Sequence, residues 1–402
     1  MTQAAAQSSA SASADVIVVG AGPAGSSAAY HMATLGLDVI LLEKQELGRD
    51  KVCGDGLTPS AVRELVSMGM DTTGWQRNRG LRVIGGGHLL HFPWPEQASF
   101  PSYGMARPRA LLDRDLAEHA AAAGARLLTG VTVTAPVTSP TGRVTGVEAR
   151  PTNRVAYPGI EGPTTFTAPL VVDAGGVSAR LATAVGRTKN ERRPMGVAVR
   201  AYFRSPRAKD AWMESRLELW DGTPGKSDLL PGYGWIWSVG EGLVNVGLGS
   251  VSSRAQATAI DYRAVFNRWM DNVPASWGFT KENQVGGLVS AALPMAFNRK
   301  PHYADGLMLL GDAGGMVSPF NGEGIAQALM SGRLAAQAAA QASARTTTSG
   351  REQVLAQYPK ALSSEMGGYY TLGRVFVALI EHPEVMRLCT RYGLPRKHLM
   401  RL

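Results

Sequence analysis

The stretch Asp15-Val-Ile-Val-Val-Gly-Ala-Gly-Pro-Ala-Gly25 predicts the fold of this 402-residue chain. Its β-branched apolar run indicates a buried strand, and a Gly-x-Gly-x-x-Gly motif follows at once. Gly20 allows a sharp turn, Gly22 lets the backbone approach a pyrophosphate, and Gly25 lets the next helix pack closely on the strand. The N-terminus of that helix then faces the anion.

The residues after the motif complete a nucleotide-binding unit. Small side chains predict a helix from Ser26 to Leu35, and Val39–Leu42 predicts a second strand. Glu43 ends that strand 18 residues after Gly25, about where a carboxylate meets ribose hydroxyls. Strand, turn, helix, strand and acid together predict a dinucleotide site. A motif this close to the N-terminus is usual for FAD enzymes and does not exclude NAD.

Composition places the chain among folded globular proteins, with 45% hydrophobic and 18% charged residues. The net charge of +9 is scattered except towards the C-terminus, and no nucleic-acid motif is present, so no nucleic-acid partner is expected. Cys53 and Cys389 have no metal-ligand spacing and form no disulfide framework, which suits a reducing cytoplasm and predicts no metal site. No stretch reaches the roughly 18 consecutive apolar residues of a membrane-spanning helix.

Two further glycine turns follow apolar runs, at Leu170-Val-Val-Asp-Ala-Gly-Gly176 and Leu309-Leu-Gly-Asp-Ala-Gly-Gly315. The second run delivers Asp312 to the carboxyl end of a buried strand, where ligands bind in open α/β sheets. Gly322 and Gly324 then open a long helix whose free N–H groups can face an anion or a ring carbonyl.

The three glycine turns expected to bind the cofactor are far apart in the sequence. We therefore expect an α/β fold with a discontinuous, Rossmann-like FAD-binding domain of the glutathione reductase type. A mainly β substrate domain is inserted into it, and a helical segment ends the chain. The expected parts are a disordered leader over 1–14, the FAD-binding domain over 15–78, 104–186 and 296–345, the β-rich domain over 79–103 and 187–295, and the C-terminal helices over 346–402.

The Gly-Asp stretch around Asp312 resembles that of FAD monooxygenases and reductases related to p-hydroxybenzoate hydroxylase. The resemblance implies that Asp312 binds the ribityl chain and that Gly324 and Ile325 face the pyrimidine edge of the flavin. Arg109 opens a helix similar to the family's Arg-x-x-Leu-Asp-x-x-Leu start, which implies contact with FAD; an exposed arginine at a helix start is the alternative. The family's usual Asp-Gly pair is Asp173-Ala-Gly here.

Two stretches, 50–59 with its Lys-x-Cys-Gly core and 231–249, resemble geranylgeranyl reductases, among them actinobacterial menaquinone reductases. The resemblance implies a flavoenzyme that saturates a carbon–carbon double bond of an isoprenoid, either a geranylgeranyl group or the polyprenyl tail of menaquinone. Reduced FAD would supply the hydride. The implied partner is an isoprenoid lipid, and the electron donor, a ferredoxin-like protein or NAD(P)H, stays open.

The chain departs from that pattern at four positions. Trp237-Ser238 stands where relatives read Phe-Pro, Ser318 where they read Asn, and Gln327 where they often read Tyr. These positions are expected near the flavin. An FAD-dependent monooxygenase, which epoxidises or hydroxylates a terpenoid or polyketide, is therefore the alternative function.

Tyr233, Trp235 and Trp237 alternate along a predicted strand, so their side chains share one face. We expect them to line a lipid tunnel; a plain hydrophobic sheet face is the alternative. Catalytic roles are predicted for Cys53, Tyr233 and Trp235, although an inert buried thiol is the alternative for Cys53. The expected cofactor-binding residues are Gly20, Gly22, Pro23, Ala24, Gly25, Glu43, Lys44, Cys53, Gly54, Gly56, Arg109, Val133, Asp312, Gly322, Gly324 and Ile325.

The C-terminal segment that begins at Arg374-Val-Phe-Val-Ala-Leu-Ile is apolar and is followed by several basic residues. Such a segment suits the surface of an anionic bilayer. It equally suits a docked helix with one solvated face. The expected location is the cytoplasm, with association at the inner face of the cell membrane in the first case.

Overall fold

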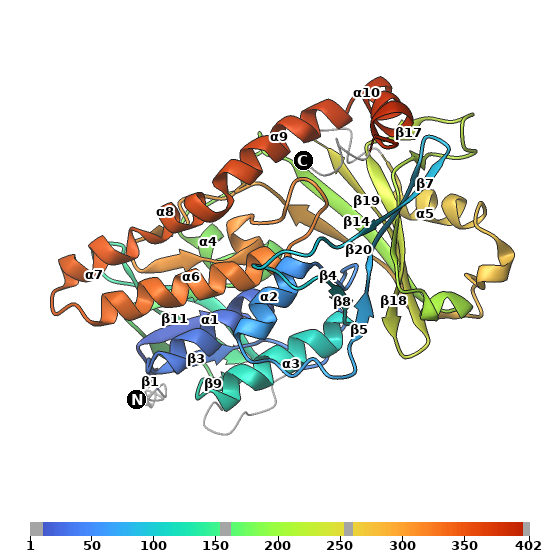
Figure 1. The fold of residues 1–402 in the computed structure, drawn as a ribbon. Coiled ribbons are helices and arrows are strands. Elements are labelled where there is room, and N and C mark those ends of the chain that lie inside the picture. The colour runs from blue at the N-terminus through green and yellow to red at the C-terminus, as the bar shows by residue number, and fades with distance from the viewer. Residues whose placement is uncertain (1–10, 153–161, 253–259, 397–402) are drawn as a thin grey trace, which may run out of the picture.

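The computed structural model describes residues 11–152, 162–252 and 260–396. Two large sheets lie side by side, and the C-terminal helices run along one side of the molecule from the first sheet to the second (Figure 1). The first sheet has six strands in the order β21-β22-β13-β2-β3-β9. All its neighbours pair in parallel except β21 with β22. The strands are β2 (Val16–Val19), β3 (Val39–Leu42), β9 (Arg126–Leu128), β13 (Leu170–Asp173), β21 (Tyr303–Ala304) and β22 (Leu307–Leu309).

Helices cover this parallel sheet because both of its faces are apolar. The helices α1 (Pro23–Thr34) and α6 (Ile325–Ser343) pack through small residues. A Cβ atom placed on Gly332 would lie 2.6 Å from the Ala28 nitrogen. At the glycine motif, a Cβ atom on Gly25 would lie 1.8 Å from the Gly20 carbonyl oxygen. Only glycine therefore permits this turn. The other helices of this part are α2 (Pro59–Ser67), α3 (Arg109–Ala122) and α4 (Arg180–Ala184).

The prediction of a disordered leader over 1–14 is wrong for its last part. Residues Ser11–Ser13 form strand β1, which pairs in parallel with β12 because a free strand edge accepts its backbone. Residues 1–10 lie outside the described residues. The four-stranded sheet that β1 joins contains β10 (Val131–Thr138), β11 (Val144–Pro151) and β12 (Thr164–Thr167).

The second large sheet has seven strands in the order β20-β14-β19-β18-β15-β6-β7. The hairpin β6–β7 comes from the first quarter of the chain, yet it pairs in parallel with β15. Helix α5 (Tyr262–Met270) packs its apolar residues on the sheet. The strands are β6 (Gly80–Gly85), β7 (His88–Pro93), β14 (Met195–Arg204), β15 (Met213–Arg216), β18 (Gly232–Gly240), β19 (Leu243–Ser252) and β20 (Gln284–Pro294).

Two short sheets complete the strands. One has the order β4-β8-β5 and the other pairs β16 with β17. The first links the nucleotide-binding part to the second large sheet. These strands are β4 (Gly56–Leu57), β5 (Gln76–Asn78), β8 (Gly104–Ala106), β16 (Leu219–Trp220) and β17 (Leu229–Leu230).

The C-terminal helices are anchored at both ends of their path. Tyr358 donates its hydroxyl hydrogen to the Leu309 carbonyl at 3.1 Å, and Tyr370 donates to that of Met316 at 2.6 Å. Further on, Ile380 and Met386 pack against Leu229. None of the helices in the described ranges has the length and hydropathy needed to span a bilayer. The helices are α7 (Thr348–Leu355), α8 (Tyr358–Leu362), the π-helix η6 (Ser363–Gly367), α9 (Gly368–Ile380), α10 (Pro383–Leu388) and the π-helix η7 (Cys389–Gly393).

Candidate active site

One cavity of about 570 Å³ lies between the two large sheets. Its walls include the turns at the carboxyl ends of β2, β13 and β22, where α/β sheets bind ligands. The opposite wall is the face of β18 and β19, and segments from α9 to η7 close a third side. A volume in this range suits a cofactor or substrate site.

The N-terminus of α1 forms one end of the cavity, through Gly22, Pro23 and Ala24. A Cβ atom on Gly22 would meet nothing closer than the Arg109 guanidinium, at 3.9 Å. The space in front of this helix end is therefore open to an anion. Gly20 and Gly25 shape the turn behind it, as expected from their spacing.

Two cations face this end of the cavity. Arg109 is buried and held by Asp113 through two hydrogen bonds of 2.7 and 2.8 Å, so its guanidinium has a fixed direction. Lys51 lies 4.0 Å from Asp312. The positive charge of Arg109, together with burial, lowers the pKa of Lys51. This cation pair suits the two phosphates of a dinucleotide. Lys51 was not predicted as a site residue, although it belongs to the quoted Lys-x-Cys-Gly loop.

Besides Gly20 and Gly25, three predicted cofactor residues are not part of the cavity wall. The Glu43 carboxylate accepts a hydrogen bond from the Ala21 nitrogen at 2.9 Å, at the glycine turn. Lys44 is exposed at the end of β3, and Val133 is buried in the core below the sheet. Their contact with a nucleotide stays a prediction.

Most of the loop of residues 50–58 lines the cavity. Its centre, Asp55, is fully buried and has a left-handed backbone with φ of 61°. Its carboxylate accepts hydrogen bonds from the Tyr202 hydroxyl at 2.6 Å, the side-chain amide of Asn245 at 2.8 Å and the backbone N–H of Arg109 at 3.1 Å. Burial raises its pKa to about 6. Asp55 thus ties the nucleotide-binding part to the second sheet, a role that was not predicted.

The aromatic row on β18 was predicted to share one face, and the structure confirms this. The ring centroids of Tyr233 and Trp235 are 6.0 Å apart, and those of Trp235 and Trp237 are 5.8 Å apart. All three rings line the cavity.

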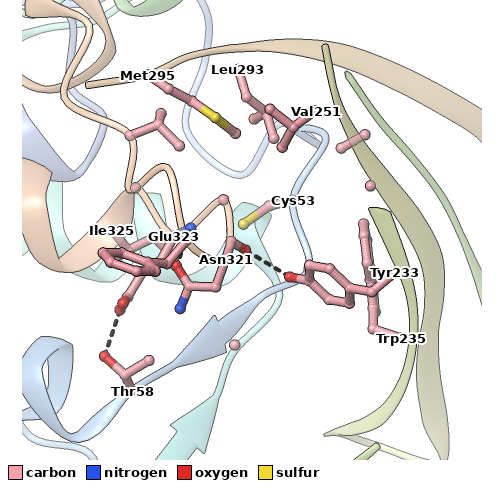
Figure 2. Close-up of a pocket in the computed structure, with 18 of the residues that line it drawn as sticks. Cys53, Thr58, Tyr233, Trp235, Val251, Leu293, Met295, Asn321, Glu323 and Ile325 are labelled. Carbon is pink, nitrogen blue, oxygen red and sulfur yellow. Dashed lines mark hydrogen bonds between the residues drawn. The ribbon is translucent and has the colours of Figure 1, made fainter. Parts of the chain in front are cut away.

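The polar atoms of these rings form hydrogen bonds to the segments opposite. Tyr233 donates to the Asn321 carbonyl at 2.6 Å (Figure 2), and Trp237 donates to that of Gly54 at 2.5 Å. Trp235 donates to the Asn245 side chain at 2.8 Å, which in turn binds the Cys53 carbonyl at 2.9 Å. Since every polar edge is occupied, the rings offer the cavity their apolar faces.

The glycines of the 50–58 loop permit this close packing. A Cβ atom on Gly54 would lie 2.8 Å from Trp237, and one on Gly56 would lie 2.5 Å from Met213. Cys53 lies beside the hydrogen bond that joins Tyr233 to Asn321 (Figure 2). Burial raises the pKa of its thiol, so the thiol stays neutral at physiological pH. The catalytic role of Cys53 stays a prediction.

Glu323 is a cavity residue that the sequence reasoning missed. It precedes Gly324, the N-cap of α6, and its carboxylate accepts a hydrogen bond from the Thr58 hydroxyl at 2.5 Å. Burial raises its pKa to about 7. Only the glycines on either side of it, Gly322 and Gly324, were singled out from the sequence, and the acid between them is the signal that was overlooked.

The residues at this end fit a flavin dinucleotide. The open space at Gly22 and the cation pair suit a pyrophosphate, and Asp312 lines the wall between them and the N-terminus of α6. The chain belongs to the FAD-binding domain family, whose model matches residues 13–360. FAD is its cofactor, and the class that the fold and the site define is an FAD-dependent oxidoreductase.

Particular relatives narrow this class. A menaquinone reductase of Mycolicibacterium smegmatis is 36% identical, over 93% of this chain and 86% of that protein. Digeranylgeranylglycerophospholipid reductase 2 of Methanopyrus kandleri is 29% identical, over 88% of this chain and 83% of that protein. These findings confirm the resemblance to isoprenoid reductases.

A solved structure shares the fold. A geranylgeranyl bacteriochlorophyll reductase-like protein of Thermoplasma acidophilum superposes with a TM-score of 0.75 and 23% identity, over 97% of this chain and 99% of that one. The predicted α/β class, with an FAD-binding domain and C-terminal helices, is confirmed.

Proposed function

We propose that this protein saturates a carbon–carbon double bond of an isoprenoid chain, as in a geranylgeranyl group or the polyprenyl tail of menaquinone. One observation carries the proposal: a single cavity joins a nucleotide-binding end to a row of three aromatic rings. The substrates in the names of the two relatives above, a quinone and a phospholipid, have only an isoprenoid chain in common. We therefore take the isoprenoid chain of the substrate, and not its head group, as the part that fits the apolar wall of the cavity.

Saturating an isolated alkene adds one proton to one carbon and one hydride to its neighbour. Reduced FAD, when bound, supplies the hydride. The alkene carries no carbonyl to polarise it, so protonation leads and the second carbon gains positive character. The ring faces of Trp235 and Tyr233 stabilise that charge by cation–π attraction. Glu323 and Cys53 are cavity groups that can hold the proton near neutral pH, since burial raises the pKa of each.

The assay for this function is anaerobic. Protein reduced with dithionite is mixed with a polyprenyl quinone or a geranylgeranyl lipid, and the mass of the product is measured by mass spectrometry. We expect the lipid to gain two hydrogen atoms although oxygen is excluded. Product that forms only with oxygen and gains an oxygen atom would instead establish the monooxygenase alternative. Replacing dithionite with a ferredoxin-like protein or NAD(P)H identifies the electron donor.

An isoprenoid lipid is dissolved in a bilayer, so we also propose that the protein acts in the cytoplasm at the inner face of the cell membrane. The basic residues near the C-terminus support this location, because anionic lipids attract them.

A Glu323→Gln variant tests whether the carboxyl group of Glu323 is protonated in the folded protein. The pKa is about 7 in the folded protein and near 4.5 unfolded, so the folded state alone keeps the proton between these values. The stability that this proton contributes is present below about pH 4.5 and is lost as the pH rises to about 7. Glutamine still accepts from Thr58 and does not titrate. The variant should therefore gain stability relative to wild type across this window, by at most about 3 kcal/mol.

Urea unfolding of both proteins at pH 5 and pH 8 measures the difference. Glu118→Gln, on the exposed side of α3, is the matched control and should show no such change. A difference between Glu323→Gln and wild type that is the same at both pH values would contradict a buried, proton-holding Glu323.

A further inference from the structure

Exposed hydrophobic side chains gather on one segment. Of the ten large hydrophobic side chains that the described residues expose, seven lie between Tyr369 and Tyr392. Leu372, Val375 and Leu379 are spaced along one side of α9 and are 62%, 55% and 50% exposed. The remaining members of this outer face are Tyr369, Phe376, Leu388 and Tyr392.

The opposite side of the same segment closes the cavity. Tyr370, Gly373, Val377 and Ile380 are buried, and Ile380 lines the cavity together with residues of α10 and η7. A Cβ atom on Gly373 would lie 2.3 Å from Pro319. Helix α9 is therefore packed tightly against the loop that precedes α6. Only the thickness of this one helix separates the cavity from the exposed outer face.

Three aromatic rings connect the outer face to the cavity. Phe376 is 38% exposed and also lines the cavity. The Phe320 ring, another part of the lining, lies 5.3 Å from that of Phe376 and 4.6 Å from that of Tyr369. We call Phe320, Tyr369 and Phe376 the aromatic threshold. It gives a continuous apolar path from the molecular surface to the cavity.

The charges beside the outer face favour an anionic partner. Arg387, Arg391 and Arg396 are exposed there, and Arg374 is half-buried within α9. The acidic residues of the segment from α9 to residue 396 are Glu381 and Glu384, and Glu384 is paired with Arg387 at 3.3 Å. An apolar stripe flanked by excess arginine is the pattern of a helix that lies in the interface of an anionic bilayer.

We propose that the outer face of α9 to η7 docks on an anionic bilayer and that the aromatic threshold admits the isoprenoid chain directly from the bilayer into the cavity. The entry route rests on the proposed function. The docking does not, because the exposed residues and their charges carry it alone.

Vesicle sedimentation tests the docking. Full-length protein is spun with vesicles of phosphatidylcholine, or of equimolar phosphatidylglycerol and phosphatidylcholine. We expect binding to the anionic vesicles and weaker binding to the neutral ones. The double variant Leu372→Ser/Leu379→Ser should bind at least about tenfold more weakly, since two inserted side chains are lost. The matched control Leu35→Ser/Val66→Ser changes two hydrophobic residues of similar exposure outside this segment and should bind as wild type.

Turnover tests the entry route. The double variant should reduce an isoprenoid substrate in detergent as wild type does and should lose activity on the same substrate in anionic vesicles. If the wild-type protein is inactive on the substrate in detergent, the proposed function is refuted. The docking proposal is then still decided by sedimentation of the wild-type protein with vesicles. Docking is overturned if wild type stays in the supernatant, if the double variant sediments like wild type, or if size-exclusion chromatography shows a dimer that only this variant dissociates. The entry route is overturned if the variant, although unbound, reduces vesicle substrate at the wild-type rate.

Discussion

A Gly22→Val variant is expected to fold like the wild type and to bind FAD about 100-fold more weakly. The structure leaves free space around this position, since the nearest atom to an added Cβ belongs to the Arg109 guanidinium at 3.9 Å. The backbone is extended there, with φ of −79° and ψ of −176°, which valine adopts easily. The new side chain would instead fill the space of the pyrophosphate, and overpacking of about 3 kcal/mol corresponds to about 100-fold.

The measurement is flavin content after purification, followed by titration with FAD. Gly287→Val is the matched control, because Gly287 is exposed on β20 with nothing within 4 Å of an added Cβ. Gly25→Ala gives a contrast, since its Cβ would collide with Gly20 and should impair folding itself. Wild-type affinity for FAD in Gly22→Val would place the pyrophosphate elsewhere.

An Asp55→Leu variant is expected to lose at least about 3 kcal/mol of unfolding free energy. The Tyr202 hydroxyl and the Asn245 amide would each lose a buried acceptor, at about 1–3 kcal/mol apiece. Leucine would also be strained by about 1–2 kcal/mol in the left-handed conformation. The 50–58 loop would lose its tie to the second sheet, so we expect weaker FAD binding as well.

Urea unfolding measures this loss, and Asp55→Gly separates its two causes. Glycine adopts φ of 61° without strain but offers no acceptor, so its loss should be confined to the hydrogen-bond share. An Asp55→Gly variant as stable as the wild type would show that the hydrogen bonds to Tyr202 and Asn245 contribute nothing.

Local patterns predicted two structural features of the cavity wall that the structure shows. The glycine spacing predicted the turn after β2, and alternation predicted the shared face of Tyr233, Trp235 and Trp237. Both follow from geometry within one element or one turn, which a short stretch of sequence determines. The family resemblance added the cofactor and the class of substrate.

Contacts between distant segments could not be predicted in this way. Asp55 is 147 residues from Tyr202 and 190 from Asn245, and no local period relates them. Glu323 has an unusual pKa only because the fold buries it. For the same reason, the composition of α9 left a bilayer-facing helix and a docked helix equally open.

The sequence by itself determined a nucleotide-binding βαβ unit, its FAD cofactor through family membership, and an aromatic row on one strand. Only the tertiary structure decided that this row lines the same cavity as the N-terminus of α1, that Asp55 ties the two sheets together, and that α9 has one side on the cavity and the other exposed. The physical reason is that burial and pairing belong to the packed chain. A residue's neighbours in space set its exposure, its pKa and its partners, and most of those neighbours are far away in sequence.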